Sequence, residues 1–135
     1  MANTLQFDLV SPEKRLASSP ATEVVIPGAE GELTVMEGHA PFITTLRPGI
    51  LRAVTPSGVK SFIVTGGFAE INQTAISVLA ERAIPVEEAT GTVIDDLAAE
   101  ARSLADAAQP ADKAAAEKAV NDILALKAAN LTGHH

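Results

Sequence analysis

The stretch from Gly28 to Leu51 reads GAEGELTVMEGHAPFITTLRPGIL, and it decides how this 135-residue chain folds. Six of its residues are glycine or proline, the residues that most often mark turns. Between these turns Leu33 and Val35 alternate with polar neighbours, and a similar alternation runs through residues 42–46. Alternation with a period of two indicates half-buried strands. The stretch therefore predicts short strands joined by tight turns, an arrangement that presents a shaped surface.

The same pattern extends over the first two thirds of the chain. Leu5, Phe7 and Leu9 alternate with polar residues and predict a first strand. Further β-rich runs between turn signals cover residues 22–26, 50–55, 59–65, 68–71 and 74–80. Short strands with turns about every eight to twelve residues are typical of a β-sandwich or barrel. We predict an N-terminal β-sandwich over residues 1–86, in which Gly66 and Gly67 form a bulge or a tight corner.

The period changes beyond residue 90, and the rest of the chain reads as helix. Apolar residues recur at helical spacing, namely Ile94, Leu97, Ala98, Ala101, Leu104, Ala105 and Ala108. Thr92 and Asp95 have the spacing of a capping box, which predicts that the first helix starts there. Pro110 suits the first turn of a second helix, and residues 130–133 would end it. Residues 87–135 therefore predict a C-terminal antiparallel helical hairpin, so that the fold class is mainly β plus α.

The apolar stripe of the second helix is narrow and rich in alanine. It follows Ala116, Ala119 or Val120, Ile123, Leu126 or Lys127, and Leu131. Alanine favours helix but buries little area per residue. The hairpin is therefore expected to pack closely but weakly, and to be able to detach from the sandwich.

Composition excludes several classes of function. The net charge is -7, which disfavours binding to nucleic acid or to anionic lipid. The absence of cysteine excludes disulfides and thiolate chemistry. The N-terminus does not resemble a secretory signal or a transit peptide, and no apolar run is long enough to span a membrane. We expect a cytosolic protein, or one held at a membrane by protein contacts.

A search for reactive groups finds no catalytic constellation and no cofactor or metal motif. His39 has neither a nucleophile nor a second ligand at a useful spacing, which favours a structural or interface role, and His134 and His135 are at the extreme C-terminus. Glu30, Glu32 and Glu37 leave two interpretations open: a divalent metal site or an acid/base pair on the one hand, and a solvated or protein-facing edge on the other. The absence of a calcium-loop pattern favours the second.

Several motifs together resemble one family. Pro27-Gly28-x-x-Gly31-Glu32-Leu33 is followed by Glu37-Gly38-His39-Ala40-Pro41 and by Leu46-x-Pro48-Gly49. Gly66-Gly67-Phe68-x-Glu70-Ile71 and Val78-Leu79-Ala80-Glu81 complete the set. With the opening Leu9-Val10-Ser11-Pro12, this order resembles the epsilon subunit of bacterial F-type ATP synthases, which is homologous to mitochondrial delta. The resemblance covers essentially the whole chain, and in the tail it rests on architecture more than on residues.

The resemblance implies a non-catalytic subunit of the rotating central stalk. In the family, the sandwich lies between the gamma subunit and the polar loops of the membrane proton ring, and it couples proton flow to ATP synthesis. The hairpin folds against the sandwich or extends along gamma toward the alpha and beta subunits, where it inhibits ATP hydrolysis. The resemblance thus implies a peripheral position on the cytoplasmic face of the bacterial inner membrane, with no direct membrane insertion and no nucleic acid.

The resemblance also implies where the partners bind. Glu32 matches an acidic residue that touches the ring loops, and His39 is expected in a neighbouring turn at the same end of the sandwich. The expected ring interface consists of Glu30, Gly31, Glu32, His39, Ala40, Pro41 and Phe42. Ser11 and its strand are expected on the side that faces gamma.

The tail departs from the family pattern in two ways. Some members bind ATP through Ile/Leu-Asp-x-x-Arg-Ala, where this chain has Ile94, Asp95, Ala98 and Ala99, with Ala98 in place of the arginine. Without that cation, ATP binding is expected to be weak or absent. The tail basic residues, Arg102, Lys113, Lys118 and Lys127, are outnumbered by seven acidic ones, so we expect weak inhibition. The alternative is an ATP-sensing inhibitory subunit on the same fold.

Overall fold

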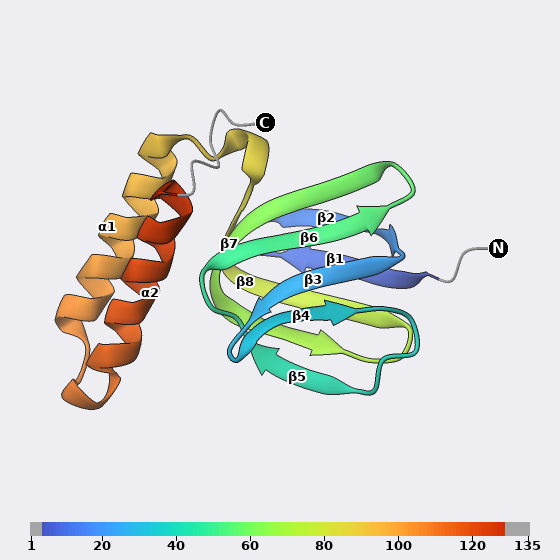
Figure 1. Ribbon diagram of the computed structural model, residues 1–135, viewed down its shortest axis with the longest axis horizontal. Coiled ribbons are helices and arrows are strands. Elements are labelled where there is room, and N and C mark those ends of the chain that lie inside the picture. The colour runs from blue at the N-terminus through green and yellow to red at the C-terminus, as the bar shows by residue number, and fades with distance from the viewer. Residues whose placement is uncertain (1–3, 129–135) are drawn as a thin grey trace. The chain divides into compact units, whose positions relative to one another are not determined.

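The computed structural model describes residues 4–128, which form two compact units that divide between Pro85 and Val86. The first unit contains only strands (Figure 1): β1 Leu5–Val10, β2 Arg15–Ala21, β3 Glu23–Gly28, β4 Gly31–Val35, β5 Phe42–Thr45, β6 Gly49–Thr55, β7 Gly58–Ile71 and β8 Ala75–Pro85. The second contains the 3-10 helix η1 Val86–Glu88 and the helices α1 Gly91–Ala107 and α2 Pro110–Ala128. Leu131, His134, His135 and the expected helix end at 130–133 lie outside the described residues.

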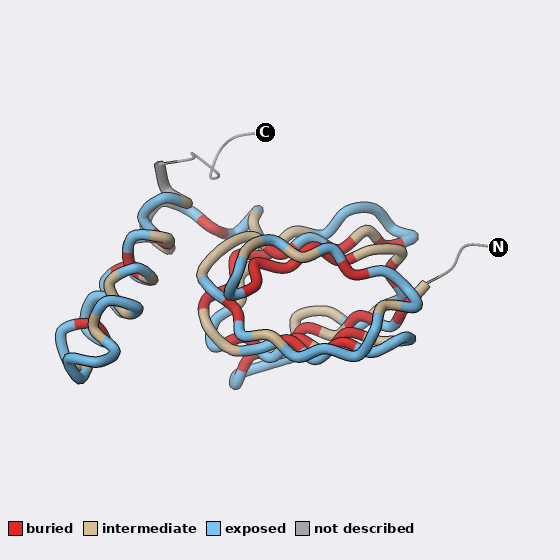
Figure 2. Tube along the Cα trace, turned by 60° about the horizontal axis from the view of Figure 1, so that its bottom comes forward, coloured by how far each residue is buried: buried red, intermediate tan, exposed pale blue. Residues whose placement is uncertain are grey.

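The strands form one twisted sheet that folds over into two layers. The strand order is β2-β1-β8-β7-β6-β3-β4, and β5 pairs with β7 beside this path. All pairings are antiparallel except that of β1 with β8. Figure 2 shows that the buried residues gather on the inner sides of the two layers. The predicted β-sandwich followed by a helical hairpin is confirmed.

The sandwich core is built from the alternating residues of its strands. Leu5, Phe7 and Leu9 are at most 1% exposed, so the predicted first strand is confirmed. The core is almost entirely aliphatic, and its aromatic members are Phe7 and Phe62. Burial of each large aliphatic side chain contributes about 1.5–3 kcal/mol, so this core holds the sandwich together.

Strand β2 was not expected from the sequence. Its residues RLASSPA have few β-branched or aromatic side chains and include Pro20, so no strand pattern stands out. The strand forms because it pairs antiparallel with β1 at the edge of the sheet, where proline is tolerated. The Ser11 turn brings the two strands together, since the amides of Ser11 and Lys14 each donate to the other's carbonyl oxygen.

Gly66 and Gly67 form a corner within a single long strand. Both have positive φ, 67° and 94°, and β7 continues through them with one unbroken register against β8. Before the corner β7 pairs with β6, and after it with β5. A Cβ on Gly67 would overlap the backbone carbonyl of Leu79, so only glycine fits there. Of the two predicted alternatives the corner is confirmed, and no register shift marks a bulge.

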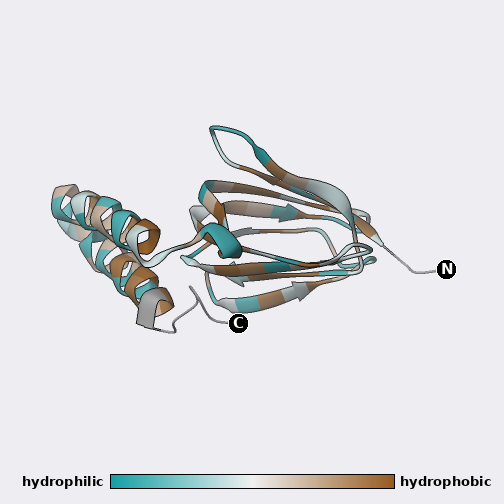
Figure 3. Ribbon diagram, turned by 90° about the horizontal axis from the view of Figure 1, so that it is seen from above, coloured by the Kyte–Doolittle hydropathy of each residue, from teal (hydrophilic) through white to brown (hydrophobic). Residues whose placement is uncertain are grey.

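The two helices of the hairpin pack through a short row of apolar residues. The buried ones are Ile94, Leu97, Ala98, Ala105, Val120 and Ile123. Hydrophilic residues recur along both helices in Figure 3. Leu104 has helical spacing with this row, yet it is 63% exposed because the adjacent Ala105 takes the inward position. The predicted break before Pro110, with proline at the start of α2, is confirmed.

The start of α1 differs from the expected capping box. The N-cap is Thr90, whose hydroxyl accepts a hydrogen bond from the Val93 amide at 3.2 Å. Thr90 has extended backbone angles, as an N-cap requires, whereas Thr92 is already inside the helix and is exposed. The prediction of a start at Thr92 with Asp95 was therefore wrong by two residues, because an equally suitable threonine precedes it.

Candidate functional site

A groove runs along the side of the sandwich between β4 and β5, which are hydrogen-bonded to β3 and β7 but not to each other. Its walls come from the β3–β4 turn, the start of β4 and all of β5, and its volume is about 590 Å³. We call it the β4–β5 groove, and it is lined by residues 28–33 and 42–45. Gly31 has a φ of 129°, a conformation open to glycine, which turns the chain sharply into β4.

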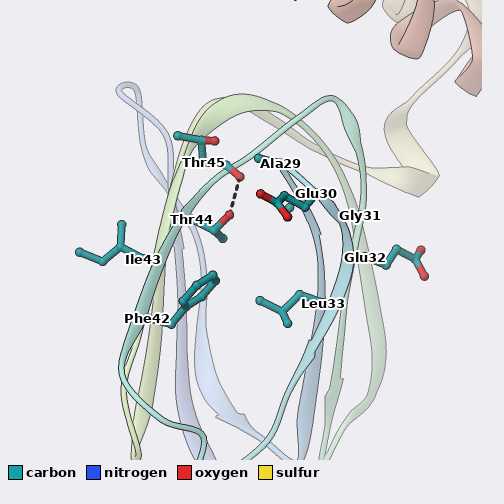
Figure 4. Close-up of a pocket in the computed structure, with 10 residues that line it drawn as sticks. Ala29, Glu30, Gly31, Glu32, Leu33, Phe42, Ile43, Thr44 and Thr45 are labelled. Atoms are coloured by element: carbon teal, nitrogen blue, oxygen red, sulfur yellow. Dashed lines mark hydrogen bonds between the residues drawn. The ribbon is translucent and has the colours of Figure 1, made fainter.

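The two glutamates of this groove point in different directions. In Figure 4 the carboxylate of Glu30 extends across the groove toward Thr44 and Thr45. Glu32, at the start of β4, extends away from the groove. Leu33 and Phe42 face each other across the groove (Figure 4). The Thr44 hydroxyl donates to the Thr45 carbonyl oxygen at 3.1 Å. The groove thus combines an apolar floor with an acidic rim.

The lining of the β4–β5 groove is acidic. The described residues that line it include two glutamates and no lysine or arginine. No group of three or more His, Asp or Glu within residues 4–128 is placed to hold a metal ion. Glu37 is separated from Glu30 and Glu32 by the rest of β4. Both groove glutamates are exposed, so an approaching cation can reach them without a large desolvation cost.

His39 does not lie at the same end of the sandwich as Glu32 at the start of β4, and that expectation was wrong. The Glu30 turn precedes β4, and the His39 loop follows it, so five extended residues of about 3.3 Å rise each separate them. The amide of Gly38 donates a hydrogen bond to the backbone carbonyl oxygen of Gln73, in the β7–β8 turn, at 2.8 Å. The Glu30 turn instead lies beside Leu46, which bridges to Gly28.

The expected ring-facing residues lie along two neighbouring hollows, and Phe42 lines both of them. Phe42 lines the β4–β5 groove together with Glu30, Gly31 and Glu32. Pro41 lines a second hollow of about 420 Å³, which it shares with Ile43 and Glu70. His39 and Ala40 line neither, and His39 Nδ1 forms a hydrogen bond with the Ala40 carbonyl oxygen at 2.7 Å. The expected residues therefore follow one edge of the sandwich and do not cluster at one point.

A second groove lies on the outer face of β1, β7 and β8, beside Ser11. Its volume is about 390 Å³, and Ser11 itself is 9% exposed. The groove is mainly apolar because Phe68 and Leu79, which are partners in the β7–β8 ladder, are 42% and 44% exposed. We call it the Ser11 groove, and its lining consists of Val10, Ser11, Pro12, Gly67, Phe68, Leu79, Ala80 and Glu81.

Phe68 and Leu79 belong to the sequence motifs, but they were not predicted as contact residues, although a signal for them exists. Ala69 and Ile71 point into the core, so the alternation along β7 directs Phe68 outward. The chain has four aromatic residues, all phenylalanine, and Phe42 and Phe68 are exposed. Phe68 together with Leu79 gives the outer face of β7 and β8 an exposed apolar pair.

The ATP-binding pattern expected at the start of α1 is incomplete in space as well as in sequence. Ile94 and Ala98 are buried within the hairpin unit, whereas Asp95 and Ala99 are exposed. Arg102 is the single basic residue of α1, and its guanidinium lies 4.0 Å from the Glu117 carboxylate. The basic side chain of α1 is therefore close to an acidic residue of α2.

Comparison with known proteins matches the sandwich to a family model. Residues 4–86 match the family model of the ATP synthase delta/epsilon chain β-sandwich domain. The chain belongs to the ATP synthase delta/epsilon chain family. This delta/epsilon-family chain is 66% identical to ATP synthase epsilon chain 1 of Cereibacter sphaeroides, over 99% of its own length and 100% of the relative's. It is 60% identical to the ATP synthase epsilon chain of Fuscovulum blasticum, over 96% and 98% of the two chains.

Solved structures extend the comparison to the hairpin. The delta/epsilon-family chain is similar to a chain in the cryo-EM structure of the Euglena gracilis mitochondrial ATP synthase OSCP/F1/c-ring assembly, with a TM-score of 0.70 and 27% identity. That match covers 96% of this chain and 82% of the other. A chain of the Tetrahymena thermophila mitochondrial central stalk and c-ring shares the fold, with a TM-score of 0.56. Neither described helix of the hairpin has the length and hydrophobicity needed to cross a bilayer.

Proposed function

We infer that this chain is a non-catalytic rotor subunit in the central stalk of a proton-translocating ATP synthase. The observation that carries this inference is the end-to-end similarity to ATP synthase epsilon chains, 66% identical over 99% of the chain. The similarity to a chain of the Euglena F1/c-ring assembly supports it. In this role the subunit links gamma to the membrane proton ring and couples proton flow to ATP synthesis. Its site is the cytoplasmic face of the bacterial inner membrane, reached through protein contacts.

We propose that the β4–β5 groove and its edge meet the polar loops of the proton ring. The groove offers exposed Glu30 and Glu32 beside exposed Phe42, so a polar loop with a cationic side chain fits it. Short glycine turns hold the backbone in a fixed shape, which reduces the entropy lost on binding. Glu32 is the stronger candidate for a direct contact, because its side chain extends outward in Figure 4 whereas Glu30 extends over the groove.

The Ser11 groove is the proposed contact for gamma. Phe68 and Leu79 together expose apolar area next to the nearly buried Ser11, and aromatic and aliphatic anchors of this kind dominate protein interfaces. The two proposed surfaces use different strand pairs, β4 with β5 and β7 with β8, so one sandwich can bind both partners at once.

A polar substitution in the Ser11 groove tests the gamma contact. Leu79→Ser should weaken binding of the purified chain to gamma at least about tenfold, because it removes a central apolar contact. Val59→Ser is the matched control, since Val59 is a 60% exposed aliphatic residue of the same sandwich outside both grooves. Equal binding by the two variants would refute this assignment without affecting the ring contact.

We propose that the hairpin inhibits ATP hydrolysis weakly. The three basic side chains of the hairpin that the structure describes each have a partner within it: Arg102 with Glu117, Lys113 with the Ala105 carbonyl, and Lys118 with Asp122. These cations therefore already have partners within the hairpin. Deletion of residues 91–135 in the whole complex should change ATP hydrolysis little, and a large gain would contradict this proposal.

The alternative, an ATP-sensing inhibitory subunit, is disfavoured by the same part of the chain. Ala98 is buried where ATP-binding members carry arginine, and Arg102 is close to Glu117. Isothermal titration of the purified chain with millimolar ATP should give no saturable heat. A clear saturable signal would favour the alternative.

A further inference from the structure

The turn end of the hairpin lacks the large apolar contacts that hold its open end. Ile94 and Leu97 of α1 and Val120 and Ile123 of α2 are buried, and all four lie away from the turn. Near the turn the buried residue is Ala105, and alanine contributes little buried area. If the hairpin opens, the two helices pivot at the turn. Apolar packing near the turn is too small to fix the angle between the helices.

Lys113 makes a bond across this turn. Its ammonium Nζ donates to the backbone carbonyl oxygen of Ala105 at 3.2 Å, in a partly buried position. The same carbonyl accepts the amide of Ala108, also at 3.2 Å. Ala105 lies in the last turn of α1, where the carbonyl groups lack partners within the helix and carry partial negative charge.

Lys113 is placed to interact with the end of α1. It lies at the fourth residue of α2, near the helix N-terminus, where the helix's own dipole disfavours a cation. The C-terminus of α1 supplies the opposite field, and the Ala105 carbonyl oxygen accepts the Lys113 ammonium in addition to the Ala108 amide. The other cation pairs differ: Lys118 binds Asp122 within α2, and Arg102 and Glu117 are 4.0 Å apart with about half of each side chain exposed.

We propose that Lys113 is a hinge lock, which fixes the angle between α1 and α2 by tying the start of α2 to the last turn of α1. Without this bond the two helices swing about residues 108–109 and sample more open arrangements. A hydrogen bond from a charged donor, discounted for partial exposure, corresponds to about a tenfold change in the opening equilibrium. The inference concerns the hairpin alone, and it stands whether or not the hairpin regulates the complex.

The absence of cysteine from the chain permits a direct test. Spin labels on Thr92→Cys and Ala125→Cys, both exposed positions near the open end, report the separation of the helices by pulsed electron paramagnetic resonance. In the full chain, Lys113→Met should raise the population at long distances about tenfold and accelerate amide exchange in α2 by a similar factor. Lys118→Met, which removes a cation from the same helix, should leave both measurements at the parent values.

Lys113→Arg distinguishes a lock from a general need for this residue in the helix. Arginine keeps a charged donor of similar reach, so this variant should recover the parent distance distribution even if Lys113→Met loses helical structure. The proposal is overturned if Lys113→Met gives the parent distribution and exchange rates. It is also overturned if Lys113→Arg behaves like Lys113→Met, or if Lys118→Met opens the hairpin equally.

Discussion

The sandwich and the hairpin are held together by different means. The sandwich joins strands distant in sequence around a core in which Phe7, Ile26 and Leu51 are completely buried. The hairpin joins two neighbouring helices through a short row of aliphatic residues and alanines, with a lysine bond at its turn. A subunit that transmits torque needs the first kind of unit, because a contact surface that deforms under load would slip. The second kind can change its arrangement at low cost.

The largest effect is expected at the corner of β7. Gly67→Ala should destabilise the sandwich by about 4 kcal/mol, because the new Cβ would overlap the Leu79 carbonyl and the residue keeps a φ near +94°. Gly38→Ala is the matched control, since Gly38 has a φ of 90° with open space around it. Urea unfolding of the two variants measures the difference in their free energies of unfolding. Similar losses of stability would show that backbone strain, and not the overlap with Leu79, accounts for the effect.

A core substitution in the hairpin tests whether the two units are stabilised separately. Ile123→Ala should cost about 2–4 kcal/mol, since Ile123 is 2% exposed between the helices. Amide exchange should accelerate in α1 and α2, while the strands keep the rates of the parent chain. If exchange in β7 and β8 accelerated to the same degree, the units would have to unfold together, and the comparison would fail.

A smaller effect is expected at the start of α1. Thr90→Ala should cost about 1 kcal/mol of hairpin stability, because it removes the hydroxyl that accepts the Val93 amide. Thr92→Ala, two residues later on an exposed helical position, should be close to neutral. Thermal unfolding followed by circular dichroism separates the two. A larger loss of stability from Thr92→Ala would contradict Thr90 as the N-cap and would support the capping box predicted from the sequence.

Local pattern was enough to predict most of the sandwich. The alternation of Leu5, Phe7 and Leu9 identified β1, and the glycines and prolines of residues 28–49 identified the turns around β4 and β5. Strand β2 was not predicted because its residues have no strand preference. It forms a strand only because it pairs with β1. Propensity reports what a segment favours alone, whereas an edge strand depends on its neighbour.

The candidate site was predictable in composition and not in shape. Glu30, Glu32 and Phe42 were expected to act together, and they line one groove. His39 was expected beside them, but β4 separates it from them, so that it lies at the opposite end of the sandwich. The turn motifs alone do not indicate how far apart two turns lie. The alternation along β7 directs Phe68 outward, but Phe68 and Leu79 become neighbours only through the β7–β8 ladder, so their pairing could not be found from either strand separately.

The central claim, that this chain turns with the proton ring, can be tested in membrane vesicles. Because the chain has no cysteine, Glu32→Cys can be joined by a disulfide to one cysteine placed in a polar loop of the ring. The disulfide should form in high yield, and ATP-driven proton pumping should continue after it forms, since the joined parts rotate together. Loss of pumping that returns on reduction would show that the chain and the ring move relative to each other, and it would contradict this account.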